Sequence, residues 1–316
     1  MELLEKIHAK IQQNGFITFD EYMDMSLYFP KYGYYNSERT DFHPKNSDFI
    51  TAPELSAIYT NSIVKFYTDS RKHKKIENVL EFGAGSGEMA YNFLKKCNSK
   101  DLPTNYFIIE KNANLIKKQK NKLQKIPKDF EKINWVDNSH VSENVFIIAN
   151  EILDAIPSKI FHKEDNKFYE KCIIKEEGNL VFSLKDCNDD YLKEIHSIED
   201  RLNRKLPNSY TFEINMRIES FLLNIFKNSK NFLLMIIDYG YHEDEFFHPQ
   251  RKYGTVQFYK NHKKINDIFS FQQGSFDISI SVNFSNIYRI AKRNSIELYS
   301  FTTQSEFLLN MNILEL

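Results

Sequence analysis

The chain has 316 residues, of which 41% are hydrophobic, so it is long enough to bury one or two cores without disulfides. Lysine and arginine (42) nearly balance aspartate and glutamate (43), and the net charge of −1 provides no basic field for nucleic acid. The cysteines Cys97, Cys172 and Cys187 form no CxxC pair, which argues against a disulfide framework and against a zinc site. We therefore expect a protein of a reducing compartment that binds no nucleic acid.

The N-terminal segment shows no targeting signal. Residues 1–15 mix acidic residues into an amphipathic helical pattern, which suits neither a signal peptide nor an arginine-rich transit peptide. No apolar run reaches the roughly 20 residues needed to cross a bilayer. We expect a cytoplasmic protein without membrane insertion, and the sequence gives no indication of its oligomeric state.

The predicted elements begin with helices and continue as alternating strands and helices. The first helix should end at Gly15, the second should begin at the capping box from Thr18 to Glu21, and another should span residues 54–70. Strands are expected in IENVLEF, NYFIIE, INWV and NVFIIAN, and helices in EMAYNFLKKC and NANLIKKQKNKLQKI. This alternation predicts an α/β fold with a doubly wound parallel sheet.

The pattern loosens over residues 158–212, where polar segments with hairpin character predict an inserted α+β segment. Alternation resumes with a helix near 213–228, the strand NFLLMIID, a strand near 278–284 and a helix near 285–294. We expect an N-terminal helical region, residues 1–75, that lines the cleft. A Rossmann-like core should comprise residues 76–157 and 213–316, and an insertion should comprise residues 158–212.

Three of the nine glycines, Gly83, Gly85 and Gly87, follow the first strand of the alternating region in VLEFGAGSGEM. In a doubly wound sheet, ligands bind beyond the carboxyl ends of the strands, where a glycine loop lets a cofactor touch the backbone. The dinucleotide fingerprint GxGxxG needs a glycine where this chain has Glu88, whose carboxylate would repel a pyrophosphate. Unless the loop only serves tight packing of strand on helix, it favours a cofactor without phosphates.

Acidic residues at the predicted strand ends favour S-adenosylmethionine, which carries an amino group, a sulfonium and a ribose. Glu81 precedes the loop and could bind the amine. Glu110, 23 residues after Gly87, stands where a carboxylate can hold both ribose hydroxyls. Asp137, after INWV, could bind the adenine amino group. Glu110 and Asp137 could each also be a solvated loop acid.

Polar residues also follow the fourth strand, in NEILDAIP. Asn150, Glu151 and Asp154 would stand at the carboxyl end of that strand, where a methyl donor meets its acceptor in this class of fold. The alternative is an ordinary helix start, with Asn150 as the cap and Glu151 complementing the helix dipole. Asp238 ends the strand of IIDYG at the same edge, unless it is only a turn acid before Gly240.

The chain resembles the MidA-like methyltransferase family, which includes the mitochondrial complex I assembly factor that methylates arginine. The blocks that carry the resemblance occur in the family's order along nearly the whole chain: LYFPKYGYYN, SDFITAPELS, LEFGAGSGEM, NEILDAIP, IIDYG, GTVQFYKNH, GSFDISISVNF and TTQSEFLL. The chain departs from the usual family pattern at Ser47, Ala84 and Ser86, where a glycine, a proline and an arginine are common.

The resemblance implies a class I S-adenosylmethionine-dependent methyltransferase that acts on an arginine of a protein, with a subunit of respiratory complex I as the natural candidate. Together with the acids discussed above, it gives three groups of candidate site residues. They are, for the cofactor, Glu81, Gly83, Gly85, Gly87, Glu110, Asp137 and Asn150; for orienting the guanidinium, Glu54, Glu151, Asp154 and Asp238; and for the substrate cleft, Asp48, Phe49, Thr51, Pro53 and Tyr239.

Methyl transfer from sulfonium to nitrogen is an in-line displacement, so positioning accounts for much of its rate. A guanidinium stays protonated at neutral pH, and carboxylates can meet it with two parallel hydrogen bonds, so acids are expected around it. Two alternatives remain open: a non-catalytic assembly or chaperone module with this fold, and an NAD-dependent oxidoreductase, which Glu88 disfavours. His242 and His248 lack companions at ligand spacing, so no metal site is expected.

Overall fold

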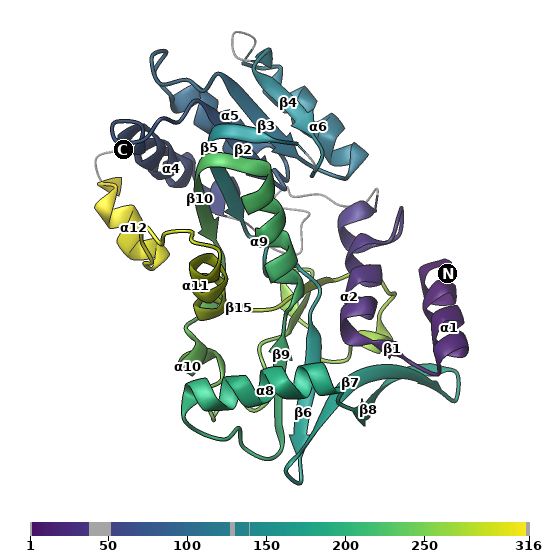
Figure 1. Cartoon of the computed structure of the whole chain (residues 1–316). Helices are drawn as coiled ribbons and strands as arrows, with labels where there is room; N and C mark the ends of the chain where they lie inside the picture. Colours follow the sequence, from purple (N-terminus) through teal and green to yellow (C-terminus); the bar gives the residue numbers. More distant parts are fainter. Residues whose placement is uncertain (1, 38–51, 127–129, 139, 314–316) are drawn as a thin grey trace. The chain divides into compact units, whose positions relative to one another are not determined.

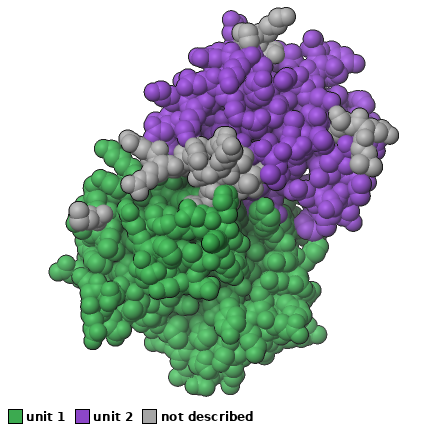
Figure 2. Space-filling view, turned by 180° about the vertical axis from the view of Figure 1, so that it is seen from behind, with its two compact units in different colours: residues 1–40, 153–220, 239–296 green, residues 41–152, 221–238, 297–316 purple. Residues whose placement is uncertain are grey.

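The computed structural model describes residues 2–37, 52–126, 130–138 and 140–313. The chain forms two compact units, which Figure 2 shows in different colours. Unit 1 contains residues 1–40, 153–220 and 239–296, and unit 2 contains residues 41–152, 221–238 and 297–316. These boundaries differ from the predicted segments, because residues 239–296 group with the N-terminal helices and with the segment 158–212 instead of with the parallel sheet.

Unit 2 is built on a parallel sheet of five strands (Figure 1). Its strands are β2 (Asn78–Phe82), β3 (Asn105–Ile109), β4 (Ile133–Val136), β5 (Ser142–Asn150) and β10 (Ser229–Ile237), in the spatial order β10-β5-β2-β3-β4. Every neighbouring pair is parallel. The strand order reverses between β2 and β5, which is the switch point of a doubly wound sheet, so the predicted fold class is confirmed.

Helices cover both faces of this sheet. They are α3 (Ala52–Leu55), α4 (Ala57–Ser70), α5 (Glu88–Lys96), α6 (Ala113–Leu123), α9 (Arg217–Asn228) and α12 (Gln304–Asn310). Along β2, Val79 joins the core under α4 and α5, whereas Leu80 joins the core on the opposite face with Ile225 of α9. This alternation follows from the two-residue period of a strand, and coverage on both faces explains why the strands are apolar throughout.

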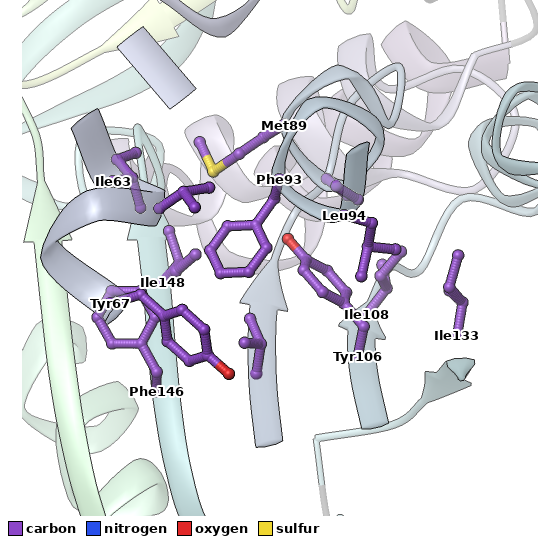
Figure 3. Close-up of a cluster of buried hydrophobic side chains, with 14 of the residues drawn as sticks. Ile63, Tyr67, Met89, Phe93, Leu94, Tyr106, Ile108, Ile133, Phe146 and Ile148 are labelled. Carbon is purple, nitrogen blue, oxygen red and sulfur yellow. The ribbon is translucent and has the colours of Figure 1, made fainter. Parts of the chain in front are cut away.

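Aromatic rings fill the core under α4 and α5 (Figure 3). The Phe93 ring of α5 lies 5.1 Å from the Tyr67 ring of α4 and 5.6 Å from the Tyr106 ring of β3, measured between centroids. Phe146 of β5 lies 5.7 Å from Tyr67. These contacts fasten α4 and α5 onto the sheet immediately behind the glycine loop that precedes α5.

Unit 1 is built on an antiparallel sheet. Its strands are β1 (Ile17–Thr18), β6 (Lys159–Glu164), β7 (Lys167–Glu176), β8 (Asn179–Asp186) and β9 (Tyr210–Ile214), and its first helices are α1 (Glu2–Asn14), α2 (Phe19–Tyr28), the 3-10 helix η1 (Tyr34–Asn36) and α8 (Asp189–Leu202). The predicted capping box of α2 is present, since the Thr18 N–H donates to Glu21 Oε2 at 3.2 Å. The first helix ends before Gly15, as predicted.

Residues 240–293 complete unit 1 with short elements. They are β11 (Gly240–Tyr241), α10 (Glu243–Phe246), β12 (Gln257–Lys260), β13 (Lys263–Lys264), η2 (Ile268–Ser270), β14 (Asp277–Ser279), β15 (Val282–Asn283) and α11 (Phe284–Arg293). Phe276 and Ile278 pack in one core with Ile7 of α1, Phe19 of α2 and Ile173 of β7, which explains why the two ends of the sequence share this unit. None of the described helices is both long and apolar enough to span a bilayer.

We expect Phe93→Ala to lower the free energy of unfolding of unit 2 by about 3–5 kcal/mol, because it leaves a cavity among buried rings. The chain's only tryptophan, Trp135, lies in unit 2, so urea denaturation followed by its fluorescence measures this unit. Phe301, which is 49% exposed in the same unit, provides the control, and Phe301→Ala should cost about 1 kcal/mol or less. Equal losses would contradict the assignment of Phe93 to the core.

Candidate active site

The parallel register brings the ends of five strands to one edge of the unit 2 sheet. Phe82 pairs with Ile109, and Ile109 pairs with Val136. Ile237 pairs with Asn150. The residues that directly follow these ends are all predicted site residues, namely Gly83, Glu110, Asp137, Glu151 and Asp238. The sequence prediction that they share one edge of the sheet is therefore met by the strand pairing.

The loop between β2 and α5 has a backbone that glycine alone adopts easily. Gly83, Gly85 and Gly87 have φ angles of +60°, +52° and +81°, in the left-handed region. A Cβ atom at Gly83 would lie 2.6 Å from Ile152 Cδ1. The Gly87 N–H donates to the Ala84 carbonyl at 2.7 Å, which closes the turn at the start of α5. The loop thus exposes main chain at a helix N-terminus, without side chains at these three positions.

Glu81 lies in β2, one residue before the strand ends, and only 3% of its surface is exposed. Its Oε2 accepts a hydrogen bond from the Tyr106 hydroxyl at 2.8 Å. Burial raises the pKa of Glu81 to about 7, with a smaller contribution from the charge of Glu110, while the bond from Tyr106 opposes the rise. Within the described part of the chain, no lysine, arginine or histidine forms an ion pair with Glu81. The structure therefore holds a buried acid beneath the loop that a cationic group would stabilise.

Glu110, at the end of β3, is held by hydrogen bonds to both carboxylate oxygens. Oε1 accepts from the backbone N–H groups of Lys111 at 2.8 Å and Asn112 at 2.9 Å. Oε2 accepts from Gln119 Nε2 at 3.2 Å. Burial raises the pKa of Glu110 although these bonds oppose the rise. A carboxylate has about four acceptor positions, so this one retains capacity for a ligand hydroxyl.

The other predicted cofactor residues differ in their surroundings. Asp137 is exposed after β4. Asn150, the last residue of β5, accepts a hydrogen bond at its Oδ1 from the Tyr59 hydroxyl of α4 at 2.6 Å. Glu151 follows with a φ of +51°, which is uncommon for a residue with a side chain, and its N–H donates to the Ile237 carbonyl at 2.8 Å. This bond keeps the backbone turn after β5 attached to β10.

The remaining predicted residues are divided among several segments. In unit 2, Glu54 of α3 accepts a hydrogen bond from the Ser86 hydroxyl of the glycine loop, Pro53 is buried on α3, and Asp238 directly follows β10. The predicted cleft residues Asp48, Phe49 and Thr51 lie outside the described residues.

Asp154 and Tyr239 belong to unit 1. Asp154 Oδ2 accepts a hydrogen bond from Ser279 Oγ at 2.9 Å, and its carbonyl accepts one from the Ile280 N–H at 2.9 Å. Burial raises the pKa of Asp154 to about 6, while the bond from Ser279 opposes the rise. Tyr239 is 63% exposed, and its carbonyl accepts the Val282 N–H at 2.8 Å.

Sequence reasoning missed Gln119, which contacts several candidate site residues. Its side chain is fully buried on α6 and contacts both Gly85 and Glu110. Glutamine in an amphipathic helix is usually expected on the exposed face. Leu115 and Leu123, four residues before and after Gln119, nevertheless place it on the buried face of α6. A polar residue in the middle of an apolar stripe was the signal that would have revealed it.

The strand order and the loop define a Rossmann-like unit with a glycine loop at the switch point of its parallel sheet. Residues 59–302 match the family described as "Putative S-adenosyl-L-methionine-dependent methyltransferase". The chain is 27% identical over 336 residues to a Caenorhabditis elegans protein named "Protein arginine methyltransferase NDUFAF7 homolog, mitochondrial", covering 96% of this chain and 75% of that protein.

Two solved structures from Burkholderia thailandensis are also similar. One, described as a "likely methyl transferase" bound to S-adenosyl-homocysteine, has a TM-score of 0.91 and 26% identity, covering 99% of this chain and 81% of that chain. The other, a native structure, has a TM-score of 0.88 with the same identity and coverage. The chain belongs to this family of S-adenosylmethionine-dependent methyltransferases. The resemblance to the MidA-like family is confirmed, and the alternative of an NAD-dependent oxidoreductase is not supported.

The residues present fit S-adenosylmethionine as the cofactor. The glycine loop presents main chain without Cβ atoms at Gly83, Gly85 and Gly87, and Glu81 is a buried acid next to this loop that a cation would stabilise. Glu110 retains acceptor capacity for a ribose hydroxyl. When bound, this cofactor supplies an electrophilic methyl group on a sulfonium, and the residues around it bind and orient it.

We expect Glu81→Gln to change how stability depends on pH. The native pKa of about 7 lies above the ordinary value of 4.5, so the native state binds the proton more tightly and the wild type loses stability as pH rises between these values. At about 1.4 kcal/mol per pKa unit, the variant should gain roughly 3 kcal/mol relative to the wild type by pH 8. Urea denaturation at pH 4 to 8 measures this difference.

Tyr106→Phe is the matched control for Glu81→Gln. It removes the hydrogen bond that favours the Glu81 carboxylate, so the pKa of Glu81 should rise further and the pH range of the stability loss should move upward. A difference between Glu81→Gln and the wild type that does not vary with pH would contradict the buried, raised acid.

We expect Gly83→Ala to weaken S-adenosylhomocysteine binding at least tenfold. An alanine at φ +60° costs about 1–2 kcal/mol, and its Cβ would also press on Ile152, so the loop should shift. Gly178→Ala, in the β7–β8 turn of unit 1, is the control, since Gly178 has a φ of +89° and open space around it. Calorimetric titration should show weakened binding for Gly83→Ala alone, and equal affinities for the two variants would refute the role of the loop.

Proposed function

We propose that this methyltransferase transfers its methyl group to an arginine side chain of a protein. The observation that carries the proposal is a pair of acids at neighbouring strand ends. Glu151 and Asp238 directly follow β5 and β10, whose last residues, Asn150 and Ile237, are paired. Adjacent strands lie about 4.8 Å apart, so both carboxylates start from positions close enough to serve one guanidinium. The C. elegans relative is named as a protein arginine methyltransferase, which supports the same acceptor.

In this proposal, unit 2 binds the cofactor and supplies most of the orienting acids. Gly83, Gly85 and Gly87 present the backbone, Glu110 accepts from the ribose, Glu81 offers a negative charge beneath the loop, and Asp137 and Asn150 complete the contacts at the sheet edge. Glu151, Asp238 and Glu54 orient the guanidinium, and the orienting role expected from the sequence for Asp154 of unit 1 stays a prediction. The cleft-lining roles expected from the sequence for Pro53, Tyr239, Asp48, Phe49 and Thr51 also stay predictions.

The chemistry needs orientation and charge more than a strong base. A guanidinium delocalises its charge over three nitrogens, and carboxylates bonded to two of them draw positive charge away from the third, which attacks. The attacking nitrogen must also lose a proton, and a carboxylate within hydrogen-bond reach can accept it as the new bond forms. Holding the nitrogen in line with the methyl group supplies much of the remaining rate.

We also propose a particular substrate protein. The family resemblance implies that it is a subunit of respiratory complex I. The cytoplasmic location expected from the sequence stays a prediction, and the C. elegans relative is named as mitochondrial. Both points are settled in cells by isolating the methylated protein and by locating the tagged chain.

Transfer of labelled methyl to protein tests the proposal. The wild type should label a protein substrate, and hydrolysis should release methylated arginine. Glu151→Gln keeps the size of the side chain and removes its charge, so kcat should fall at least tenfold while the affinity for S-adenosylhomocysteine stays within about twofold. Label recovered on lysine or on a carboxyl group would refute the arginine acceptor, and absence of label from every protein would favour a non-catalytic assembly role.

A further inference from the structure

We infer that Gln119 is a positioning residue that joins the glycine loop to Glu110 and fixes both for the nucleoside part of the cofactor. This inference rests on the cofactor roles proposed above for the loop and for Glu110. Gln119 Nε2 donates to the Gly85 carbonyl at 2.9 Å and to Glu110 Oε2 at 3.2 Å. Its Oε1 accepts from Trp135 Nε1 at 2.8 Å. One buried amide thus connects α6, β4 and the two segments expected to touch the cofactor.

The three partners permit only one orientation of this amide. Both Nε2 donors face acceptors, and Oε1 faces the indole N–H of Trp135, which is a donor only. Rotating the amide by 180° would place Oε1 against the Gly85 carbonyl and the Glu110 carboxylate and would leave Trp135 facing an NH2 group. A buried polar side chain with satisfied partners is rigid, because each lost bond in the interior costs more than in water.

The bond to Gly85 sets the direction of a loop peptide. Carbonyl and N–H groups point in opposite directions across a planar trans peptide. Because the Gly85 carbonyl points at Gln119, the N–H of Ser86 in the same peptide points away from α6. Gln119 also lies close to Gly87, since a Cβ atom added to Gly87 would lie 3.4 Å from the Cα atom of Gln119. The loop is therefore supported along its length from the α6 side.

The bond to Glu110 fixes the second half of the site. The backbone N–H groups of Lys111 and Asn112 hold Oε1, and Gln119 holds Oε2, so the carboxylate is anchored from two sides. A ribose hydroxyl needs an acceptor at a set position, and the remaining acceptor position on the anchored Oε2 provides it without losing further rotamer freedom on binding. The same glutamine therefore aligns the ribose acceptor with the loop.

A second α6 side chain reaches the same loop. Lys122 follows Gln119 by three residues, which places it on a neighbouring position of the helix face. Its Nζ donates to Ser86 Oγ at 3.2 Å and pairs with Glu88, the first residue of α5. Helix α6 thus contacts the loop at consecutive residues, Gly85 and Ser86, through independent side chains.

Affinity for S-adenosylhomocysteine, measured by calorimetry, tests the inference. Gln119→Leu keeps a similar volume and removes the hydrogen bonds, so the Kd should rise about tenfold or more. Gln119→Glu keeps the acceptor for Trp135, removes the donors and places a second carboxylate beside Glu110. Its Kd should rise at least as much at pH 8, and the ratio of its Kd to that of the wild type should shrink as pH falls toward 5.5, because protonation restores a donor.

Leu123→Ala is the matched control for a purely structural effect. Leu123 is fully buried on the same helix and packs in the core under α5 instead of contacting the loop. It should lower Tm at least as much as Gln119→Leu and leave the Kd within about twofold of the wild type.

Three outcomes are distinguishable. If both Gln119 variants bind S-adenosylhomocysteine like the wild type, or if Leu123→Ala weakens binding as much as they do, the inference is overturned. If the wild type does not bind S-adenosylhomocysteine, the inference falls together with the cofactor site. If the variants weaken binding as described but no methylated arginine is formed, the inference stands and only the proposed acceptor fails.

Discussion

The parallel pairing of β2 with β3 and β5 is the constraint on which the rest of the structure depends. Because all five strands of unit 2 run in one direction, their carboxyl ends meet at a single edge. Successive strands lie on either side of β2, so the loops after β2 and β5 diverge and leave room for a ligand between them. The glycine loop, Glu110 and Glu151 lie at one edge of the sheet because of this pairing, although they are far apart in sequence.

Buried polar groups fix the positions of the loops that connect these strands and helices. Apolar contacts such as Phe93 against Tyr106 are tolerant of small shifts, whereas the hydrogen bonds of Gln119 are directional and hold particular atoms in place. Unit 1 uses a similar device. The buried carboxylate of Glu213 accepts from the backbone N–H of Thr255, and a Cβ at Gly254 would lie 2.1 Å from Glu213 Oε1. In both units, a buried side chain and a nearby glycine together determine the path of a loop.

Periodicity in the sequence was sufficient to predict the parallel sheet, because each strand of unit 2 is an apolar run followed by a glycine or an acid. It also predicted hairpin character where β7 and β8 pair, but not the assembly of unit 1, because the cohesion of that unit comes from contacts between distant segments. Ile17 of β1 pairs with Ile173 of β7, and Thr211 bridges to Tyr253. Neither pairing leaves a local pattern in the sequence. The role of Gln119 was not predicted for a different reason. Its burial depends on contacts with Trp135 and Gly85, and only the folded chain brings these residues together.

In the proposed cofactor site, the buried acids beside the glycine loop would link cofactor binding to protonation. Burial raises the pKa values of Glu81 and Glu110, so holding them as carboxylates at neutral pH costs the folded protein free energy. A cationic cofactor in the loop offsets this cost, because an opposite charge favours the ionised form. Such binding would lower the pKa of Glu81 and release a proton from it, so the same linkage predicts tighter cofactor binding as pH rises toward 7. In the proposed site, the buried carboxylate that costs the folded protein free energy would therefore favour a ligand that carries positive charge.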